Sequence, residues 1–267
     1  MKAVIDFYES YDEEKRITTD KARKTEFYVT ITILNQHIKP HNRILELGAG
    51  TGVYSFYYAE RGNHVVATDL SPKHVEIMKQ KLKEKHSNIN LCAEVVDAVD
   101  LSIYEGEAFD VVNCLGPMYH FKEKEHRIKC IQECIRVLKP GGLLAISYIN
   151  KHYIIHGVLA NQKEFFTKDF VDDIMNTGTH NDGGENCFFT VAYFTSPMEM
   201  ESFLTEFHEV EIIDHVSTDG IGTLLRSDID ELSEEQYDAY LSYVIKNCKD
   251  KSTMGLSNHG LLICRKK

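Results

Sequence analysis

Apolar residues occur along the chain in two alternating patterns. Some form short continuous runs, which are typical of strands buried on both faces of a sheet. Others recur every three or four positions, which is typical of a helix with one apolar face. This alternation predicts a parallel sheet covered by helices on both faces. The runs lie at 44–47, 64–70, 89–97, 109–115 and 143–149, separated by helical patterns at 53–61, after Pro72 and at 122–138 and by a turn at 139–142 (KPGG).

The first 40 residues are predicted to be helical. Phe27, Ile31 and Leu34 recur at helical spacing, and Pro40 ends the pattern. Tyrosines in this segment stand among acidic residues and allow two interpretations. They belong either to a lid whose aromatic rings fold over a ligand or to an ordinary packing helix.

After residue 150 the regular alternation stops. Residues 151–196 mix charged, amide and aromatic side chains, and a turn at 182–186 (DGGEN) precedes a strand-like run at 187–195. This composition predicts an inserted region rather than another strand–helix unit. Alternation resumes with a helix at 197–207, a strand at 210–217, a helix at 233–247 and a last strand at 260–265. We therefore predict a single domain over 1–267, with a helical lid (1–40), a cofactor-binding core (41–150), an inserted substrate-side region (151–200) and a completion of the sheet (201–267).

Composition and charge narrow the range of partners. The formal net charge is −11, and the basic run Lys79–Lys85 is interpreted as a solvated helix face. Proteins that neutralise nucleic-acid phosphates usually present a basic face, so no nucleic-acid partner is expected. No run approaches the ~18 consecutive apolar residues of a membrane span. The amino terminus also lacks the apolar core of a secretory signal, so a cytoplasmic protein without a membrane partner is expected.

The seven cysteines point in the same direction. Several lie inside apolar runs, and no C-x-x-C pair occurs. This usage favours reduced, buried thiols over a disulfide framework. Cys130 and Cys134 share a helix face, as do His152 and His156, but no sequence neighbour completes a ligand set for either pair. No metal is therefore expected.

Candidate chemistry begins at the segment 43–52, RILELGAGTG, where a strand runs into a glycine-rich turn and a helix follows. The spacing differs from the dinucleotide fingerprint G-x-G-x-x-G, because position 53 is valine. No G-K-[ST] follows, which excludes a P-loop. Glu46, just ahead of the turn, would repel a phosphate and favour an ammonium group.

Carboxylates follow the next two strands as well. Asp69 ends the second strand, where it is suited to accept both hydroxyls of a ribose. Asp97 and Ala98 end the third, where they suit an adenine amino group beside an apolar patch. Ligands of open parallel sheets bind at this edge. Taken singly, Asp69 and Asp97 are equally well explained as a helix-cap neighbour and a solvated residue, but together they favour a cationic, phosphate-free adenosine ligand.

With these features the chain resembles the class I S-adenosylmethionine-dependent methyltransferases. The matching stretches are ELGAGTG at 46–52, ATDLS at 67–71, VVDAVDL at 95–101, FDVVNCLGPMYHF at 109–121 and LKPGGLLAIS at 138–147. The resemblance implies an α/β fold: a Rossmann-like, doubly wound, seven-stranded, mostly parallel sheet with an antiparallel last strand, plus a small inserted lid or cap region. It implies S-adenosyl-L-methionine as cofactor. The residues it places around that cofactor are Glu46, Gly48, Ala49, Gly50, Gly52, Asp69, Leu70, Asp97, Ala98, Asn113 and Leu115.

The loop after the fourth strand, 116–120, is predicted to stand beside the reacting end of the cofactor. Methyl transfer needs alignment above all, and a base only when the nucleophile must lose a proton. His120 is the candidate base or orienting group, and Tyr119 a hydrogen-bonding partner of the acceptor, although a histidine after an apolar run is more often structural. No N-P-P-Y or D-P-P-Y motif occurs, which disfavours a DNA adenine target. Aromatic residues are predicted to line a pocket for a small, partly apolar acceptor: Tyr11, Tyr28, Tyr148, Tyr193 and Phe189.

Two other functions stay open on the sequence. One is an NAD-linked oxidoreductase on a Rossmann sheet, which Val53 and Glu46 disfavour. The other is a non-catalytic, regulatory module that binds S-adenosylmethionine without transferring a methyl group. Methyl transfer leaves little catalytic signature, so the residues do not separate this module from an enzyme. The sequence also leaves open whether oxygen, nitrogen, sulfur or carbon is methylated and what the oligomeric state is.

Overall fold

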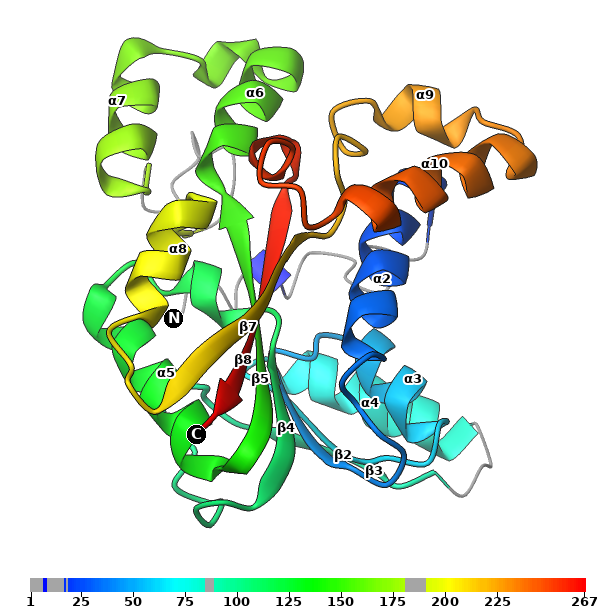
Figure 1. Ribbon diagram of the computed structural model, residues 1–267, viewed down its shortest axis with the longest axis vertical. Coiled ribbons are helices and arrows are strands. Elements are labelled where there is room, and N and C mark those ends of the chain that lie inside the picture. The colour runs from blue at the N-terminus through cyan, green and yellow to red at the C-terminus, as the bar shows by residue number, and fades with distance from the viewer. Residues whose placement is uncertain (1–6, 9–16, 18, 85–88, 181–190) are drawn as a thin grey trace.

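The structure is a computed structural model that describes residues 7–8, 17, 19–84, 89–180 and 191–267 (Figure 1). Its centre is a twisted sheet with strand order β3-β2-β1-β4-β5-β8-β7, and the two-residue strand β6 pairs with β5 beside this path. The strands are β1 (Arg43–Leu47), β2 (His64–Asp69), β3 (Leu91–Val95), β4 (Phe109–Cys114), β5 (Leu138–Asn150), β6 (Phe194–Thr195), β7 (Val210–Ser217) and β8 (His259–Lys266).

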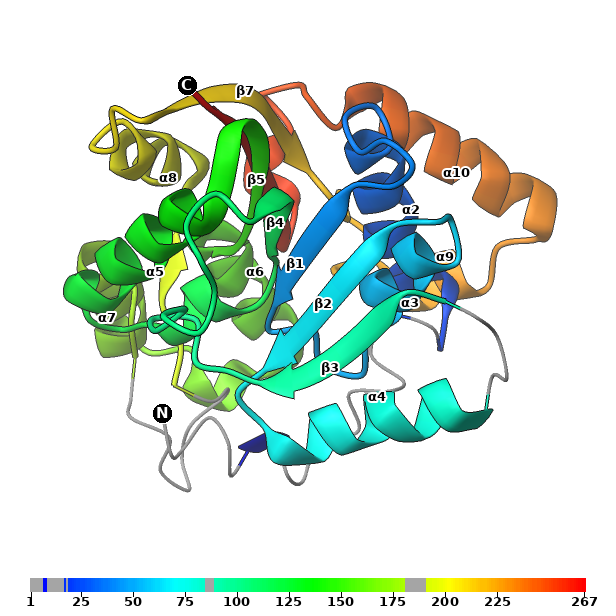
Figure 2. The same cartoon turned by 90° about the horizontal axis from the view of Figure 1, so that it is seen from below.

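Pairing is parallel from β3 through β5, whereas β8 is antiparallel to both of its neighbours, β5 and β7. The predicted mostly parallel sheet with an antiparallel last strand is therefore confirmed, and β6 adds one short strand to it. Figure 2 shows β3, β2, β1 and β4 side by side in this order.

Helices cover both faces of the sheet because successive strand residues point to opposite sides. Ile44 and Val111 contribute to the core against α2 (Lys21–Leu34), α3 (Val53–Ala59) and α10 (Glu234–Asn247). Their neighbours Leu45 and Val112 contribute to the core against α5 (Lys124–Val137) and α8 (Pro197–Leu204). Figure 1 shows these two helix groups on opposite sides of the sheet. The helices are α2 (Lys21–Leu34), α3 (Val53–Ala59), α4 (Pro72–Glu84), α5 (Lys124–Val137), α6 (Lys151–Asn161), α7 (Lys168–Thr177), α8 (Pro197–Leu204), α9 (Arg226–Asp230) and α10 (Glu234–Asn247).

Two sequence-based expectations need correction. The expected turn at 139–142 lies inside β5, where the strand bulges outward. Pairing passes from Phe109–Leu138 directly to Val111–Leu143, so β5 accommodates extra residues, and Gly141 adopts a φ of 73° there. The second correction concerns the strand-like run at 187–195. Of its described part, only Phe194–Thr195 forms a strand, and residues 181–190 lie outside the described residues.

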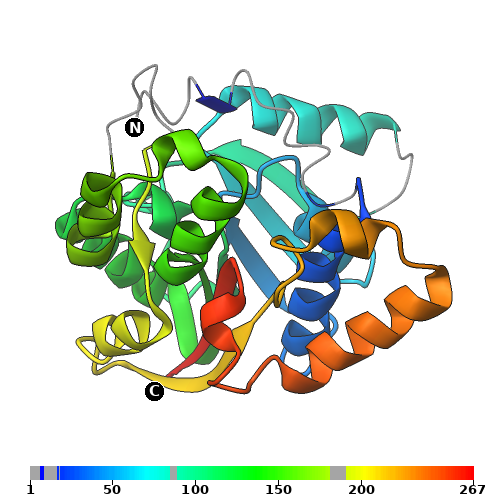
Figure 3. The same ribbon diagram turned by 90° about the horizontal axis from the view of Figure 1, so that it is seen from above.

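The inserted region is mainly helical in its described part. Helices α6 and α7 pack on each other through a small core that includes Val158, Phe170 and Ile174. Tyr119, from the loop after β4, belongs to the same core, so the insertion rests on the predicted site loop. Figure 3, viewed onto the strand ends, shows α6 and α7 on one side and α9 and α10 on the other. No helix within the described ranges is long and apolar enough to cross a membrane.

Candidate functional site

The glycine loop between β1 and α3 turns through three left-handed residues. Gly48, Gly50 and Gly52 have φ values of 67°, 56° and 88°, a region that residues with a Cβ rarely enter. At Gly48 space is limiting as well, because a Cβ there would lie 2.9 Å from Cδ of Pro117. The loop therefore packs closely against the loop that follows β4. Position 48 requires glycine for two reasons, the positive φ and the lack of space for a Cβ.

Asp69, at the end of β2, holds the glycine loop in place. Its Oδ2 accepts a hydrogen bond from the Gly50 amide at 2.8 Å, and its Oδ1 accepts one from the Ser71 amide at 2.8 Å. His74, in the first turns of α4, places Nδ1 3.3 Å from Oδ1. One carboxylate thus joins the loop to the start of the next helix. Its remaining lone pairs are available for a ligand.

Glu46 is a buried carboxyl group on β1, two residues before the loop. Burial raises its pKa to about 7. The Ser55 hydroxyl donates a hydrogen bond to its Oε2, which favours the charged form and limits the rise. Glu46 therefore titrates near neutrality, and a cation in the adjacent space would favour its carboxylate form.

A pocket opens where these elements meet, at the carboxyl edge of the parallel strands. It encloses about 1040 Å³, including the space at its open mouth. Its described wall carries the carboxylates of Glu26, Glu46, Asp69 and Asp97 and no lysine or arginine, which suits a cationic ligand. The wall includes these residues predicted from the sequence: Glu46, Gly48, Ala49, Gly50, Asp69, Leu70, Asp97, Ala98, Leu115, Tyr119 and His120.

Other predicted site residues lie away from this wall. Gly52 caps α3, and Asn113 is fully buried in β4 with an amide that lacks a partner among the described residues. Tyr148 points into the core on the α5 and α8 side of the sheet, where its hydroxyl lies 2.8 Å from Nε2 of His215. The ring of Tyr193 lies 3.6 Å from Cζ of Arg127.

The two remaining tyrosines predicted to contact a substrate come from the amino-terminal segment. Tyr28 is 38% exposed on α2 and does not line the pocket, whereas Glu26 of the same helix does. Two residues along a helix correspond to a rotation of about 200°, so the two side chains point in opposite directions. The predictions for Tyr11 and Phe189 fall outside the described residues.

His120 lies in a 3-10 turn, Pro117–His120, directly after β4. Its Nδ1 lies 3.2 Å from the carbonyl oxygen of Val191 and its Nε2 lies 3.0 Å from the hydroxyl of Tyr8. Because a carbonyl only accepts, these partners assign the proton to Nδ1 and make Nε2 the acceptor of the Tyr8 hydroxyl. Burial lowers the pKa of His120 to about 4. The imidazole is therefore neutral at pH 7 and weakly basic.

Sequence reasoning missed several wall residues, among them Glu26, Ser71 and His74. Ser71 and His74 had a usable signal, because they lie just before and within the first turn of α4, which follows Asp69. Tyr8, one of the tyrosines of the possible amino-terminal lid, does line the pocket. Its ring packs edge-on against His74 and His120, with centroid distances of 5.6 and 5.5 Å.

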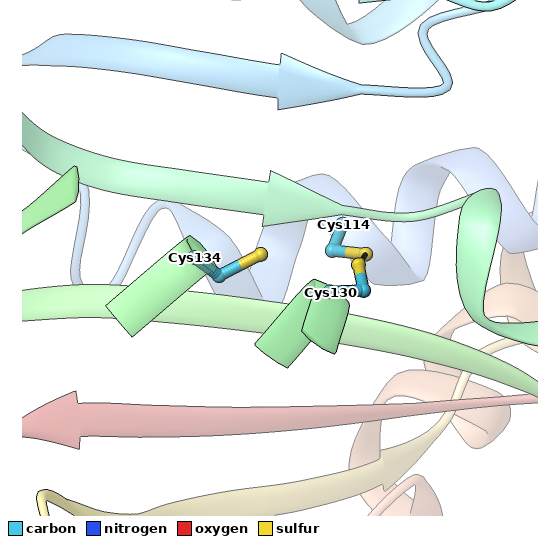
Figure 4. Close-up of side chains that lie close together, drawn as sticks. All are labelled: Cys114, Cys130 and Cys134. Carbon is cyan, nitrogen blue, oxygen red and sulfur yellow. Dashed lines mark hydrogen bonds between the residues drawn. The ribbon is translucent and has the colours of Figure 1, made fainter. Parts of the chain in front are cut away.

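Three thiols gather between the end of β4 and α5 (Figure 4). Cys114 at the end of β4 places its sulfur 3.8 Å from that of Cys130, and Cys134 lies one turn further along α5. All three are buried. The six described cysteines are free thiols and five of them are buried, as expected. The fold thus brings Cys114 next to Cys130 and Cys134, a pair for which the sequence offered no third ligand.

Comparisons with known proteins agree with this geometry. Residues 44–142 match a sequence profile described as a methyltransferase domain. A ubiquinone biosynthesis O-methyltransferase from Xanthomonas campestris pv. campestris (strain B100) is 28% identical over 142 residues, which cover 53% of this chain and 55% of that protein. The chain spans about half the length of the curated relatives it matches.

Solved structures resemble the chain over most of its length. A SAM-dependent methyltransferase from Methanosarcina mazei superimposes with a TM-score of 0.59 at 18% identity, covering 88% of this chain and 96% of that one. The PH0226 protein from Pyrococcus horikoshii OT3 superimposes with a TM-score of 0.63 at 17% identity, covering 98% and 99%. At such identities these two likenesses establish the fold.

Proposed function

We propose that the chain, which matches the methyltransferase domain profile, is a class I S-adenosylmethionine-dependent methyltransferase that moves a methyl group from S-adenosyl-L-methionine to a small-molecule acceptor. One observation carries this proposal. The glycine loop, Asp69 and Asp97 come together on the wall of a single acidic pocket at the carboxyl edge of the sheet.

The residues of this pocket fit the cofactor. Gly48, Ala49 and Gly50 line the pocket, where their small side chains let a ligand lie against the backbone of the loop. Asp69, already anchored by two amides, retains lone pairs for ribose hydroxyls, and Asp97 with Ala98 offers a carboxylate beside an apolar contact for adenine. Glu46 offers a titrating carboxylate for the positive charge. When bound, the sulfonium group supplies an electrophilic methyl that is already activated for attack.

The chain's own contribution to the reaction is alignment and exclusion of water. Tyr8, Tyr119 and His120 lie together on the wall beyond the glycine loop. His120 is neutral, and its Nε2 already accepts the Tyr8 hydroxyl. With a pKa near 4 it is better suited to orient Tyr8 or an acceptor than to remove a proton.

The residues of the pocket wall and the names of the related proteins indicate the class of acceptor. Tyr54, Tyr119 and Phe121 add aromatic surface to an otherwise acidic pocket. The curated relatives are named for O-methylation in ubiquinone biosynthesis, although they match this chain over only about half their length. We propose a small, partly apolar acceptor, whose side of the pocket includes Tyr8, Ile17 and Glu26 from the amino-terminal 40 residues.

The proposal is tested first by calorimetric titration with S-adenosylmethionine and S-adenosylhomocysteine. Both are expected to bind to the wild type. Asp69→Ala is expected to lose binding, because it removes the anchor of the glycine loop together with the ribose acceptors. Asp110→Ala is the matched control: Asp110 lies at the opposite edge of the sheet, bonded to the Arg43 amide and paired with Lys139. Absence of heat with both ligands in the wild type would refute the proposed function.

A further inference from the structure

A second group of chemically active side chains lies beside the pocket and belongs to none of the motifs above. Glu26 of α2, Asp219 just after β7 and His259 at the start of β8 bring one ligand atom each to within 4.8 Å of one another. Nδ1 of His259 lies 3.0 Å from Oδ2 of Asp219 and 3.6 Å from Oε2 of Glu26. Three remote segments of the chain therefore converge on one point.

Of the three residues in the cluster, only Glu26 lines the pocket wall. Asp219 is 1% exposed and His259 is 8% exposed, and both lie behind that wall. The His259 ring lies 6.4 Å from the ring of Tyr119, which is also on the wall. The cluster thus adjoins the pocket at Glu26 and Tyr119.

The backbone holds two of the three side chains firmly. Antiparallel pairing of Ser217 with Gly260 brings the end of β7 beside the start of β8. Oδ1 of Asp219 accepts the amide of His259 at 3.1 Å and the hydroxyl of Ser257. The Asp219 amide in turn donates to Ser257 Oγ at 3.2 Å. These bonds fix Oδ2 of Asp219 toward the imidazole before any ligand arrives.

The distances decide what this arrangement is suited to hold. Bonds of about 2.0–2.2 Å from an ion to nitrogen and oxygen ligands place neighbouring ligand atoms about 2.8–3.6 Å apart, for angles between octahedral and tetrahedral. The observed 3.0 and 3.6 Å match such edges closely.

We propose that Glu26, Asp219 and His259 form a binding site for a divalent transition-metal ion, of the Mn²⁺, Fe²⁺ or Zn²⁺ type, on the acceptor side of the pocket. One imidazole and two carboxylates are a ligand set that these ions accept. Three protein ligands leave further coordination positions free for other ligands, and Glu26 connects the site to the pocket.

The role of the ion rests on the proposed methyltransferase function. An ion at this point would bind a hydroxyl or enol oxygen of the acceptor and lower its pKa, so that the proton would pass to solvent water before the oxygen accepts the methyl group. That proton transfer is the task for which the weakly basic His120 is poorly suited. The site thus points to acceptors that carry an ionisable oxygen.

The test is a titration of the metal-free protein with Mn²⁺, following the electron paramagnetic resonance signal of the free ion. Mn²⁺ is chosen because it prefers oxygen and nitrogen ligands and avoids the thiol cluster at Cys114. We expect one tight site per chain. Asp219→Asn and Glu26→Gln are each expected to weaken it at least tenfold. Asp173→Asn is the matched control, because it alters a similar His–Asp contact, to His180 at 2.8 Å, outside this cluster.

The outcomes separate the possibilities. Stoichiometric Mn²⁺ binding that both cluster variants weaken, and that the control does not, supports the site. Failure of the wild type to bind Mn²⁺ at millimolar concentration, or equal binding by Glu26→Gln, overturns it and leaves a hydrogen-bonded His–carboxylate group. Thermal unfolding of each variant checks the fold, and Glu26→Gln stands as the test if Asp219→Asn does not fold. Titration with S-adenosylmethionine on the same samples tests the proposed function independently.

Discussion

The two walls of the pocket are built in different ways. The cofactor wall consists of segments that directly follow β1, β2, β3 and β4, and each was visible in the sequence as a strand followed by a short polar motif. The opposite wall draws on Tyr8 and Glu26 from the amino-terminal part, with Asp219 and His259 behind it. The first wall is encoded locally, whereas the second exists only once remote segments are paired. Substitutions on each wall should therefore disturb different functions.

The largest effect is expected on the cofactor wall from Gly48→Val. A valine there combines a φ of 67° with a Cβ 2.9 Å from Pro117, which together cost roughly 4 kcal/mol. Affinity for S-adenosylmethionine in calorimetry should fall at least about a hundredfold. Gly141→Val is the control, because its φ of 73° is similar but no atom lies within 4 Å of its Cβ. Equal losses in both variants would show that backbone strain, and not the contact with Pro117, matters.

A smaller effect is expected from Glu46→Gln, and it depends on pH. Between pH 4.5 and 7 folded Glu46 keeps a proton that the unfolded chain has released, so stability falls as pH rises through this range. The total loss is roughly 3 kcal/mol, and Glu46→Gln should escape it. Urea denaturation of the cofactor-free proteins measures the free energy of unfolding at each pH. The difference between Glu46→Gln and the wild type should increase in favour of the variant up to pH 7 and stay constant above it. A constant difference across this range would contradict the raised pKa.

His120 provides an internal comparison for that measurement, because its slope has the opposite sign. Its pKa is lowered from 6.5 to about 4, so between these values the unfolded chain holds the extra proton and stability rises with pH. The two groups oppose each other between pH 4.5 and 6.5. Removing the Glu46 titration should therefore make the rise visible in the variant. The affinity for the cofactor should increase as the pH rises through 7, because Glu46 ionises there. The Glu46→Gln variant should not show this increase.

The smallest effect is expected from Tyr8→Phe on the opposite wall. The change removes one hydrogen bond to His120 Nε2 and keeps the ring between His74 and His120. Loss of such a bond costs about 1 kcal/mol, so cofactor affinity should fall by less than about fivefold. A loss above tenfold in calorimetry would place Tyr8 on the cofactor wall and remove the distinction drawn between the two walls.

The features that could be predicted from the sequence are those set by residues close together in the chain. Strand ends at Leu47, Asp69 and Cys114 were predicted to within a residue, because apolar runs and glycine or proline mark them locally. Tyr28 was predicted to face the pocket because it is aromatic, but rotation about α2 gives that position to Glu26. Tyr148 was also predicted to line the pocket, but the alternation of side chains along β5 turns it toward the core beneath α8.

The sequence by itself determined the class of fold and the cofactor wall of this protein. Each part of that wall directly follows its own strand, and parallel strands bring their carboxyl ends to one edge. Tertiary structure alone decided the other wall. Glu26, Asp219 and His259 meet because the register between β7 and β8 and the packing of α2 against the sheet set their positions. No local pattern records such contacts, since they depend on residues that are far apart in the chain.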